Sequence, residues 1–494
     1  MKKHIKMYQI LVCFIVMLCN TLYAQSDYKP TWESLDARPV PEWFQDAKIG
    51  IFIHWGLYSV PAWSPKGTYS EWYQYWLQNK TLFGNGNFKG DEIVNYHEKT
   101  YGKDFTYYDF AKDFKADLFD ADQWAELIEK SGAKYTVLTS KHHDGFALWP
   151  SKEANDRGFL WNSMDVGAKR DLVGEFSEAV KKTNVKMGLY YSLYEWYHPL
   201  WQNNKKRFVD EHFLPQVKDL VTRYNPDILW GDGEWDMEAE KWKSKAFLAW
   251  LYNESVAKDH IVVNDRWGKG IRKHHGGYFT TEYETEAPEF KRPWEECRGM
   301  GFSFGYNQNE DAEDYNSPKA LVLTLINIVS TGGNLLLDIG PDARGKIPVI
   351  MQERLLQIGS WLKTNGEAIY GSRLWHNSFQ WSLKGEKNYK PKQHYLGSEV
   401  ILKQTIDPEL GYAVKELFFT QNKEAYFVIL PKWKHEITIR DFKAPKDAKI
   451  SLLATHQTLK GKQKGNDFVI TLPDYNPSLF KETDGYAYVI KITK

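Results

Sequence analysis

Eight short apolar runs, each followed by polar or aromatic residues, recur along the first three quarters of the chain: 48–53, 135–139, 185–189, 227–230, 261–263, 278–280, 301–303 and 334–337. Segments with apolar residues at i, i+3 and i+4 separate several of these runs, as amphipathic helices do; they are 120–132, 171–183, 208–224, 244–257 and 317–330. Alternating strands and helices form a parallel sheet, and eight strands favour an α/β fold of the (β/α)8 barrel type. Short, irregular connections between 261 and 303 predict a distorted barrel.

The pattern changes after about residue 372. Further apolar runs follow with turn residues between them and no helical periodicity: 400–402, 416–419, 426–430, 436–439, 468–471 and 486–490. Such spacing predicts an antiparallel β-sandwich. We therefore expect a barrel domain over residues 27–372 and a C-terminal β-sandwich domain over 373–494.

The N-terminus has the pattern of a secretory signal. Lys2, Lys3 and Lys6 precede the apolar run 10–18, and Ala24 offers a small residue for cleavage. We predict a signal peptide over residues 1–24 and a secreted or periplasmic mature protein with no membrane anchor. Of the three cysteines only Cys297 lies beyond this segment, so the mature chain forms no internal disulfide.

Composition excludes some classes of partner. Lys plus Arg and Asp plus Glu both number 64, and the formal net charge is zero, which argues against nucleic acid or an anionic membrane as the main partner. Aromatic residues make up 16% of the chain. Aromatic rings stack on the apolar faces of sugars, although any single ring more often belongs to the core.

Two carboxylates at strand ends would suit hydrolysis of a glycosidic bond. Asp232 follows the run 227–230 between two glycines and lies on the same side as Trp230 by strand alternation. Glu234 shares that side, so spacing does not choose between the two, and either acid also fits a surface loop. For the second carboxylate, Glu282 lies nearest a strand end, and Glu295 lies further on.

Three strand-end histidines raise the question of a metal. His142 and His143 are adjacent, so in a strand they would point to opposite faces, which disfavours chelation. The i, i+4 helical pattern of metal-binding histidines is absent from the sequence. We expect His54, His142 and His143 to be neutral imidazoles that hydrogen-bond a polar ligand, with structural histidines as the alternative. No metal and no cofactor are expected.

Many separate motifs, in order from about residue 30 to 372, resemble glycoside hydrolase family 29, the retaining α-L-fucosidases. They are Lys48–Gly56, Tyr58–Pro61, Glu71–Tyr73, Lys141–Phe146, Arg170–Val173, Gly188–Ser192, Asn264–Trp267, Ser303–Asn307 and Gly332–Leu337. The resemblance implies a retaining exo-α-L-fucosidase that removes terminal α-L-fucosyl residues from glycans through a covalent intermediate.

The resemblance also implies roles for residues. Asp232 matches the nucleophile, and Glu282 matches the acid/base of one group of members, while Glu295 stays as the alternative because the position varies. Residues that match those holding the fucose are His54, Glu71, Trp72, His142, His143, Tyr190, Trp230 and Arg266, with Phe304 beside the sugar's methyl group. Two alternatives remain: a catalytically inactive fucose-binding, lectin-like protein, and a glycosidase of different sugar specificity.

Overall fold

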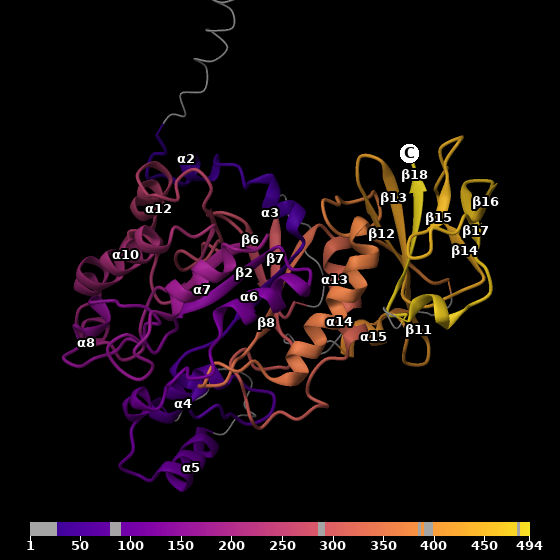
Figure 1. The fold of residues 1–494 in the computed structure, drawn as a ribbon. Helices are drawn as coiled ribbons and strands as arrows, with labels where there is room; N and C mark the ends of the chain where they lie inside the picture. Colours follow the sequence, from indigo (N-terminus) through magenta and orange to yellow (C-terminus); the bar gives the residue numbers. More distant parts are fainter. Residues whose placement is uncertain (1–26, 80–89, 285–291, 384–386, 390–398, 482–484) are drawn as a thin grey trace, which may run out of the picture.

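The structure, a computed structural model, describes residues 27–79, 90–284, 292–383, 387–389, 399–481 and 485–494 (Figure 1). The predicted signal peptide, residues 1–24, lies outside these ranges. Within the described part of the chain, no helix is both long and apolar enough to cross a membrane.

Eight parallel strands form one sheet in the order β5-β4-β3-β2-β1-β8-β7-β6. The two end strands are joined where Tyr278 N–H donates to the carbonyl of Val263 (3.1 Å) and Gly277 N–H donates to the carbonyl of Asn264 (3.2 Å). The sheet thus curls into the distorted barrel that the spacing predicts. Its strands are β1 Ile49–Ile53, β2 Tyr135–Lys141, β3 Lys186–Ser192, β4 Ile228–Asp232, β5 Val262–Val263, β6 Phe279–Glu282, β7 Trp294–Gly299 and β8 Gly333–Ile339.

Seven of the eight predicted runs lie on these strands, and the seventh in chain order is wrong. We predicted a strand over 301–303, but this segment is a bend, and β7 occupies Trp294–Gly299 instead. Two charged residues, Glu295 and Glu296, hide this strand from the hydropathy pattern. Both are buried and hydrogen-bonded, to Trp230 and Arg298 among others.

Helices follow most strands, and side chains cap several of their first turns. Asp120, Asp171 and Ser317 each accept a backbone N–H in the first turn of a predicted helix. The predicted segment 208–224 begins as a π-helix, Phe208–Phe213, and continues as α10. The helices of the barrel are α2 Trp32–Asp36, α3 Glu42–Ala47, α4 Tyr73–Asn79, α5 Gly90–Tyr101, α6 Ala121–Lys130, α7 Leu172–Val180, α8 Pro199–Asn203, α9 Lys205–Arg207, α10 Leu214–Tyr224, α11 Ala239–Trp242, α12 Ser244–Asn253, α13 Pro318–Ser330 and α14 Val349–Asn365.

Apolar side chains form two separate layers around the barrel strands. The larger cluster lies between the strands and the helices and includes Ile51, Leu189 and Leu229. The smaller cluster fills the barrel interior and includes Phe52 and Trp230. Strand alternation explains this division, because successive side chains of one strand point to opposite faces.

The described residues also form short 3₁₀ helices at Leu57–Ser59, Ser70–Trp72, Tyr107–Lys112, Glu153–Asn155, Gly366–Ala368 and Pro477–Phe480.

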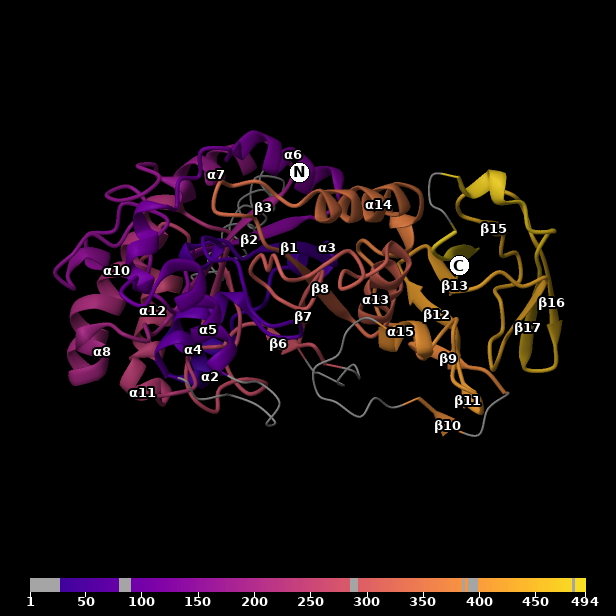
Figure 2. The same cartoon turned by 90° about the horizontal axis from the view of Figure 1, so that it is seen from below.

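Two antiparallel sheets form the C-terminal β-sandwich, with strand orders β15-β18-β13-β12-β9 and β14-β17-β16, around an apolar core of their own. In both views α13 and α14 lie between the barrel strands and these sheets (Figure 1 and Figure 2). The strands of these two sheets are β9 Phe379–Trp381, β12 Lys415–Gln421, β13 Ala425–Leu430, β14 Glu436–Ile439, β15 Ile450–Leu452, β16 Lys460–Lys464, β17 Asp467–Thr471 and β18 Tyr488–Thr493. Two further strands, β10 Lys387–Asn388 and β11 Tyr412–Ala413, pair with each other in a small parallel sheet.

One predicted strand of this part is wrong. Residues 400–402 belong to the short helix α15, Glu399–Lys403. The run Val-Ile-Leu carries only three residues, and periodicity does not distinguish a strand from a helix over so short a stretch. Four of the other predicted runs lie on β12, β13, β14 and β17, and the run 486–490 overlaps the first half of β18.

Candidate active site

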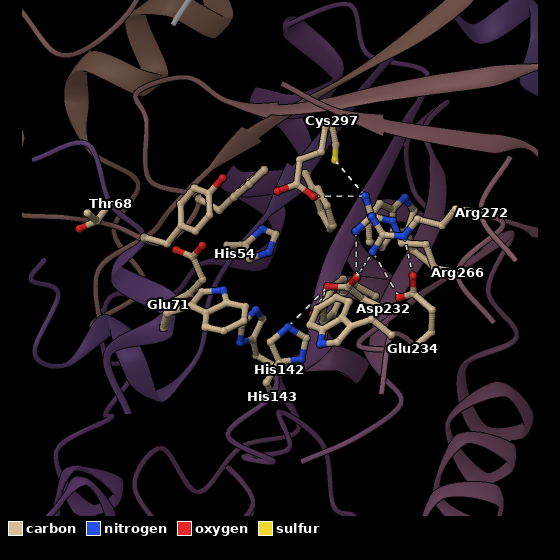
Figure 3. Close-up of a pocket in the computed structure, with 18 of the residues that line it drawn as sticks. His54, Thr68, Glu71, His142, His143, Asp232, Glu234, Arg266, Arg272 and Cys297 are labelled. Carbon is tan, nitrogen blue, oxygen red and sulfur yellow. Dashed lines mark hydrogen bonds and ion pairs between the residues drawn. The ribbon is translucent and has the colours of Figure 1, made fainter. Parts of the chain in front are cut away.

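A cavity of about 790 Å³ opens at the carboxyl ends of the barrel strands, where barrels of this type carry their functional residues. Figure 3 shows its labelled histidines and Glu71 on one side, opposite Asp232, Arg266 and Arg272. Asp232 is the last residue of β4, whereas the histidines and Arg266 lie just beyond the ends of β1, β2 and β5, and Glu71 lies on the 3₁₀ helix Ser70–Trp72. The predicted site residues that line the cavity are His54, Glu71, Trp72, His142, His143, Tyr190, Trp230, Asp232, Arg266, Glu282 and Phe304.

Asp232, the last residue of β4, accepts two side-chain hydrogen bonds and lies close to a second arginine. Arg266 Nη1 donates to Oδ1 (2.8 Å), and the Tyr190 hydroxyl donates to Oδ2 (2.9 Å). Nη2 of Arg272 lies 3.5 Å from Oδ1. Burial would raise the pKa of Asp232, but the positive charges of Arg266 and Arg272 outweigh this effect and lower that pKa to about 2. Asp232 is therefore an ionised carboxylate facing the cavity.

One guanidinium contacts both candidate catalytic carboxyls. While Nη1 of Arg266 donates to Asp232, Nη2 donates to Glu282 Oε2 (3.2 Å). Nε of the same side chain donates to Thr280 (3.0 Å), whose hydroxyl in turn donates to Asp265 (2.7 Å). The fork of Arg266 therefore fixes the two carboxyls close together. A retaining glycosidase needs such a pair about 5–5.5 Å apart.

Glu234 does not share the surroundings of Asp232, although strand spacing treats them alike. The strand ends at Asp232, and Gly233 takes a positive φ of 74°, which turns the chain. The carboxylate of Glu234 is buried and pairs with the guanidinium of Arg272. Of the two acids, Asp232 is the one that contacts Arg266 and Tyr190.

Glu295 does not line the cavity. It lies on β7 and is fully buried in the barrel interior, where its carboxyl accepts from the Tyr135 hydroxyl (2.6 Å) and from the indole N–H of Trp230 (2.9 Å). Burial raises its pKa to about 7. Trp230 and Glu282 line the cavity, whereas Glu295 contacts Trp230 from within the barrel interior.

The three histidines of the cavity are neutral. Burial lowers the pKa of His54 to about 3 and that of His143 to about 4, and it lowers the pKa of His142 well below its usual value. The Ser192 hydroxyl donates to a backbone carbonyl (2.7 Å), so it accepts a proton from Nδ1 of His143 (2.6 Å). This leaves Nε2 of His143 without a proton, as an acceptor for a hydroxyl group.

Hydrogen bonds also fix two other polar side chains of the cavity, His54 and Glu71. Asp338, at the end of β8, bonds to Nδ1 of His54 (2.7 Å), which leaves Nε2 of that ring for the cavity. Glu71 is buried and accepts from the backbone N–H of Gly305 (2.9 Å). Burial raises the pKa of Glu71 to about 8, so its carboxyl is largely protonated at neutral pH.

Sequence reasoning missed several residues that shape the site. Arg272 lies in the loop between β5 and β6, where the strand pattern is weakest, and no spacing rule points to it. Asp338 ends a predicted strand, so its position was a usable signal. Trp235, Lys269, His274 and Cys297 also line the cavity. Cys297 Sγ lies 3.9 Å from Nη2 of Arg266.

Among the described residues, one group of side chains is close enough to share a metal ion, and it contains none of the cavity histidines: Asp156, His198 and His212. Nδ1 of His198 accepts the N–H of Leu200 (3.1 Å), so its proton is on Nε2, which donates to Asp156 (2.7 Å). His212 bonds through both ring nitrogens to carboxylates, those of Asp156 and Glu195. Because His198 offers a proton rather than a lone pair to Asp156, the group forms a hydrogen-bonded ionic network.

Comparison with known proteins gives concordant matches. A family model described as α-L-fucosidase matches residues 15–367. An α-L-fucosidase of Dictyostelium discoideum is 44% identical over 378 residues, covering 75% of this chain and 79% of that protein. Tissue α-L-fucosidase of Homo sapiens is 39% identical over 480 residues, covering 94% and 92%. A crystal structure of Thermotoga maritima α-fucosidase in complex with fucose aligns with a TM-score of 0.74 at 36% identity, covering 94% of this chain and all of that one.

Proposed function

The chain belongs to the α-L-fucosidase family, and we propose that it is a retaining exo-α-L-fucosidase acting on terminal α-L-fucosyl residues of glycans. The observation that carries the proposal is the single guanidinium of Arg266 that contacts both Asp232 and Glu282 in one cavity. This arrangement supports double displacement, in which two nearby carboxyls act in turn.

In the first step Asp232 attacks the anomeric carbon while protonated Glu282 donates its proton to the leaving oxygen. The bond to the aglycone breaks, and a bond between the Asp232 carboxylate and fucose forms. In the second step Glu282 accepts a proton from water, which attacks the anomeric carbon and releases Asp232. Arg266 and the hydroxyl of Tyr190 hold the nucleophile ionised and aimed into the cavity before the first step.

The rest of the cavity supports recognition of fucose. Neutral imidazoles of His54, His142 and His143 suit hydrogen bonds to hydroxyl groups, because each neutral ring has one donor and one acceptor. Trp72 and Phe304 offer apolar surface, and we assign Phe304 to the methyl group of the sugar. Glu71, Tyr190, Trp230 and Arg266 complete the set of residues that we propose to hold the fucose. We further propose that residues 1–24 direct the protein to the periplasm or out of the cell.

The test is hydrolysis of aryl glycosides. We expect the purified protein to release the aryl group from an α-L-fucoside, with α-L-fucose as the first sugar product seen by NMR. A panel of aryl glycosides of other sugars should be poor substrates. Binding of fucose without hydrolysis would favour the lectin-like alternative, and faster hydrolysis of another glycoside would favour a different sugar specificity.

Chelation should leave the activity unchanged. The proposed chemistry uses two carboxyls, and the cavity histidines are neutral hydrogen-bonding groups, so EDTA treatment followed by buffer exchange should alter kcat and KM by no more than the error of the assay. Metal analysis of the same sample measures any bound zinc. Activity that falls on chelation and returns with a divalent ion would contradict this expectation, and substitutions of His142 and of His198 would then show which group of side chains binds the metal.

A further inference from the structure

A carboxyl lies where the barrel interior is otherwise mostly apolar. Glu295 has no exposed surface and is surrounded by the interior cluster that includes Phe44, Tyr135 and Trp230. Burying a carboxyl is costly unless donors satisfy it. Two donors do so here: the hydroxyl of Tyr135 at 2.6 Å and the indole N–H of Trp230 at 2.9 Å. Because burial of this carboxyl costs free energy, we look for a role of Glu295 beyond packing.

Trp230 connects Glu295 to the active site. Trp230 has its indole N–H turned down to Glu295, while the Cζ atom of Arg266 lies 4.3 Å from the centre of the indole ring. The ring also stacks on Tyr190, with 5.7 Å between ring centres and 22° between planes. Arg266 and Tyr190 are the two side chains that hold Asp232 at hydrogen-bonding distance. The orientation of the indole ring therefore affects the positions of Arg266 and Tyr190, which contact the ring and hold Asp232.

We propose that Glu295 is a positioning residue of the active site: by accepting the indole N–H of Trp230, it fixes the ring that supports Arg266 and Tyr190 and, through them, Asp232. The proposal rests on the proposed function. Glu295 touches neither substrate nor the reacting atoms. Its loss should mainly lower kcat, because a displaced nucleophile slows the chemical step, whereas a residue that only binds the ground state changes KM.

Two substitutions grade the effect. Glu295→Leu keeps the approximate shape of the side chain but removes both acceptors, and we expect kcat on an aryl fucoside to fall by about 100-fold. Glu295→Gln keeps one carbonyl oxygen for the indole N–H, so its kcat should stay within about tenfold of the parent value. Tyr135→Phe is the matched control: it removes the other donor to Glu295 and leaves the Trp230 bond in place, so kcat should change little.

A double-mutant cycle with Trp230→Phe decides whether Glu295 acts through the indole. Phenylalanine has no N–H, so in that background Glu295→Leu should cost only a small fraction of its effect in the parent. An undiminished loss of kcat in the Phe background, or an effect of Tyr135→Phe as large as that of Glu295→Leu, would overturn the proposal. So would a rise in KM at unchanged kcat.

Two controls make the kinetic results of these variants interpretable. Thermal unfolding of every variant shows that the assays use folded protein, and if Glu295→Leu does not fold, the cycle is run with Glu295→Gln, whose smaller loss should also disappear in the Phe background. The parent is assayed first on the aryl fucoside. A parent that does not hydrolyse it contradicts the proposed function, whereas an active parent with additive variants contradicts the positioning role alone.

Discussion

Replacing Asp232 with glycine is expected to lower turnover of an aryl α-L-fucoside by about 10⁴-fold or more, because the covalent route is lost with the nucleophile. The carboxylate is suited to this role because Arg266 and Arg272 lower its pKa to about 2, so it is ionised at neutral pH. Added azide enters the space that the shortened side chain leaves and should partly restore turnover. The product should be the fucosyl azide of inverted configuration, measured by NMR.

The matched control is Glu234→Gly, which leaves a similar space for azide. Glu234 lies two residues away, is also buried, and pairs with Arg272 rather than with Arg266. We expect a smaller loss of kcat and no rescue by azide. Near-normal turnover of Asp232→Gly together with an inactive, azide-rescued Glu234 variant would transfer the nucleophile to Glu234.

The barrel could be predicted because apolar runs in the sequence mark most of its strands. β2 and β8 are fully buried runs that end in polar residues, and the strand-end rule for barrels then places those residues in one cavity. The failure at β7 has a specific cause. Glu295 and Glu296 are buried acids whose partners come from other strands or from a later residue, so hydropathy marks the segment as exposed.

The site was predictable in position but not in detail. Alternation along β4 correctly puts Trp230 and Asp232 on one side, yet it also puts Glu234 there, and only the turn at Gly233 separates the two acids. The second limit is chemical. That His143 presents an unprotonated Nε2 depends on the contact of its Nδ1 with the hydroxyl of Ser192, 49 residues further along the chain, which itself donates to the carbonyl of Tyr194. Contacts of this kind depend on tertiary structure and leave no trace in local spacing.

Replacing Glu282 with alanine should separate substrates by their leaving groups. A sugar hydroxyl needs a proton to depart, so hydrolysis of natural fucosides should fall by a factor of about 10²–10⁴. An activated aryl group needs little protonation, so fucosylation by such substrates should persist. Hydrolysis of the fucosyl-enzyme should become slow because no base activates water, and a burst of aryl release in pre-steady-state kinetics should reveal the accumulated intermediate.

Azide needs no base, so it should accelerate the second step of the Glu282→Ala enzyme and give the fucosyl azide of retained configuration, opposite to the product of the Asp232 variant. Glu295→Ala is the informative comparison, because Glu295 is the other acid that resemblance to the family keeps open. Its carboxyl lies below Trp230 and outside the cavity, so its loss should slow aryl and natural fucosides alike, with no azide rescue. If Glu295→Ala instead showed the leaving-group dependence and the retained azide product while Glu282→Ala did not, the acid/base would be Glu295, and Arg266 would hold Glu282 for binding alone.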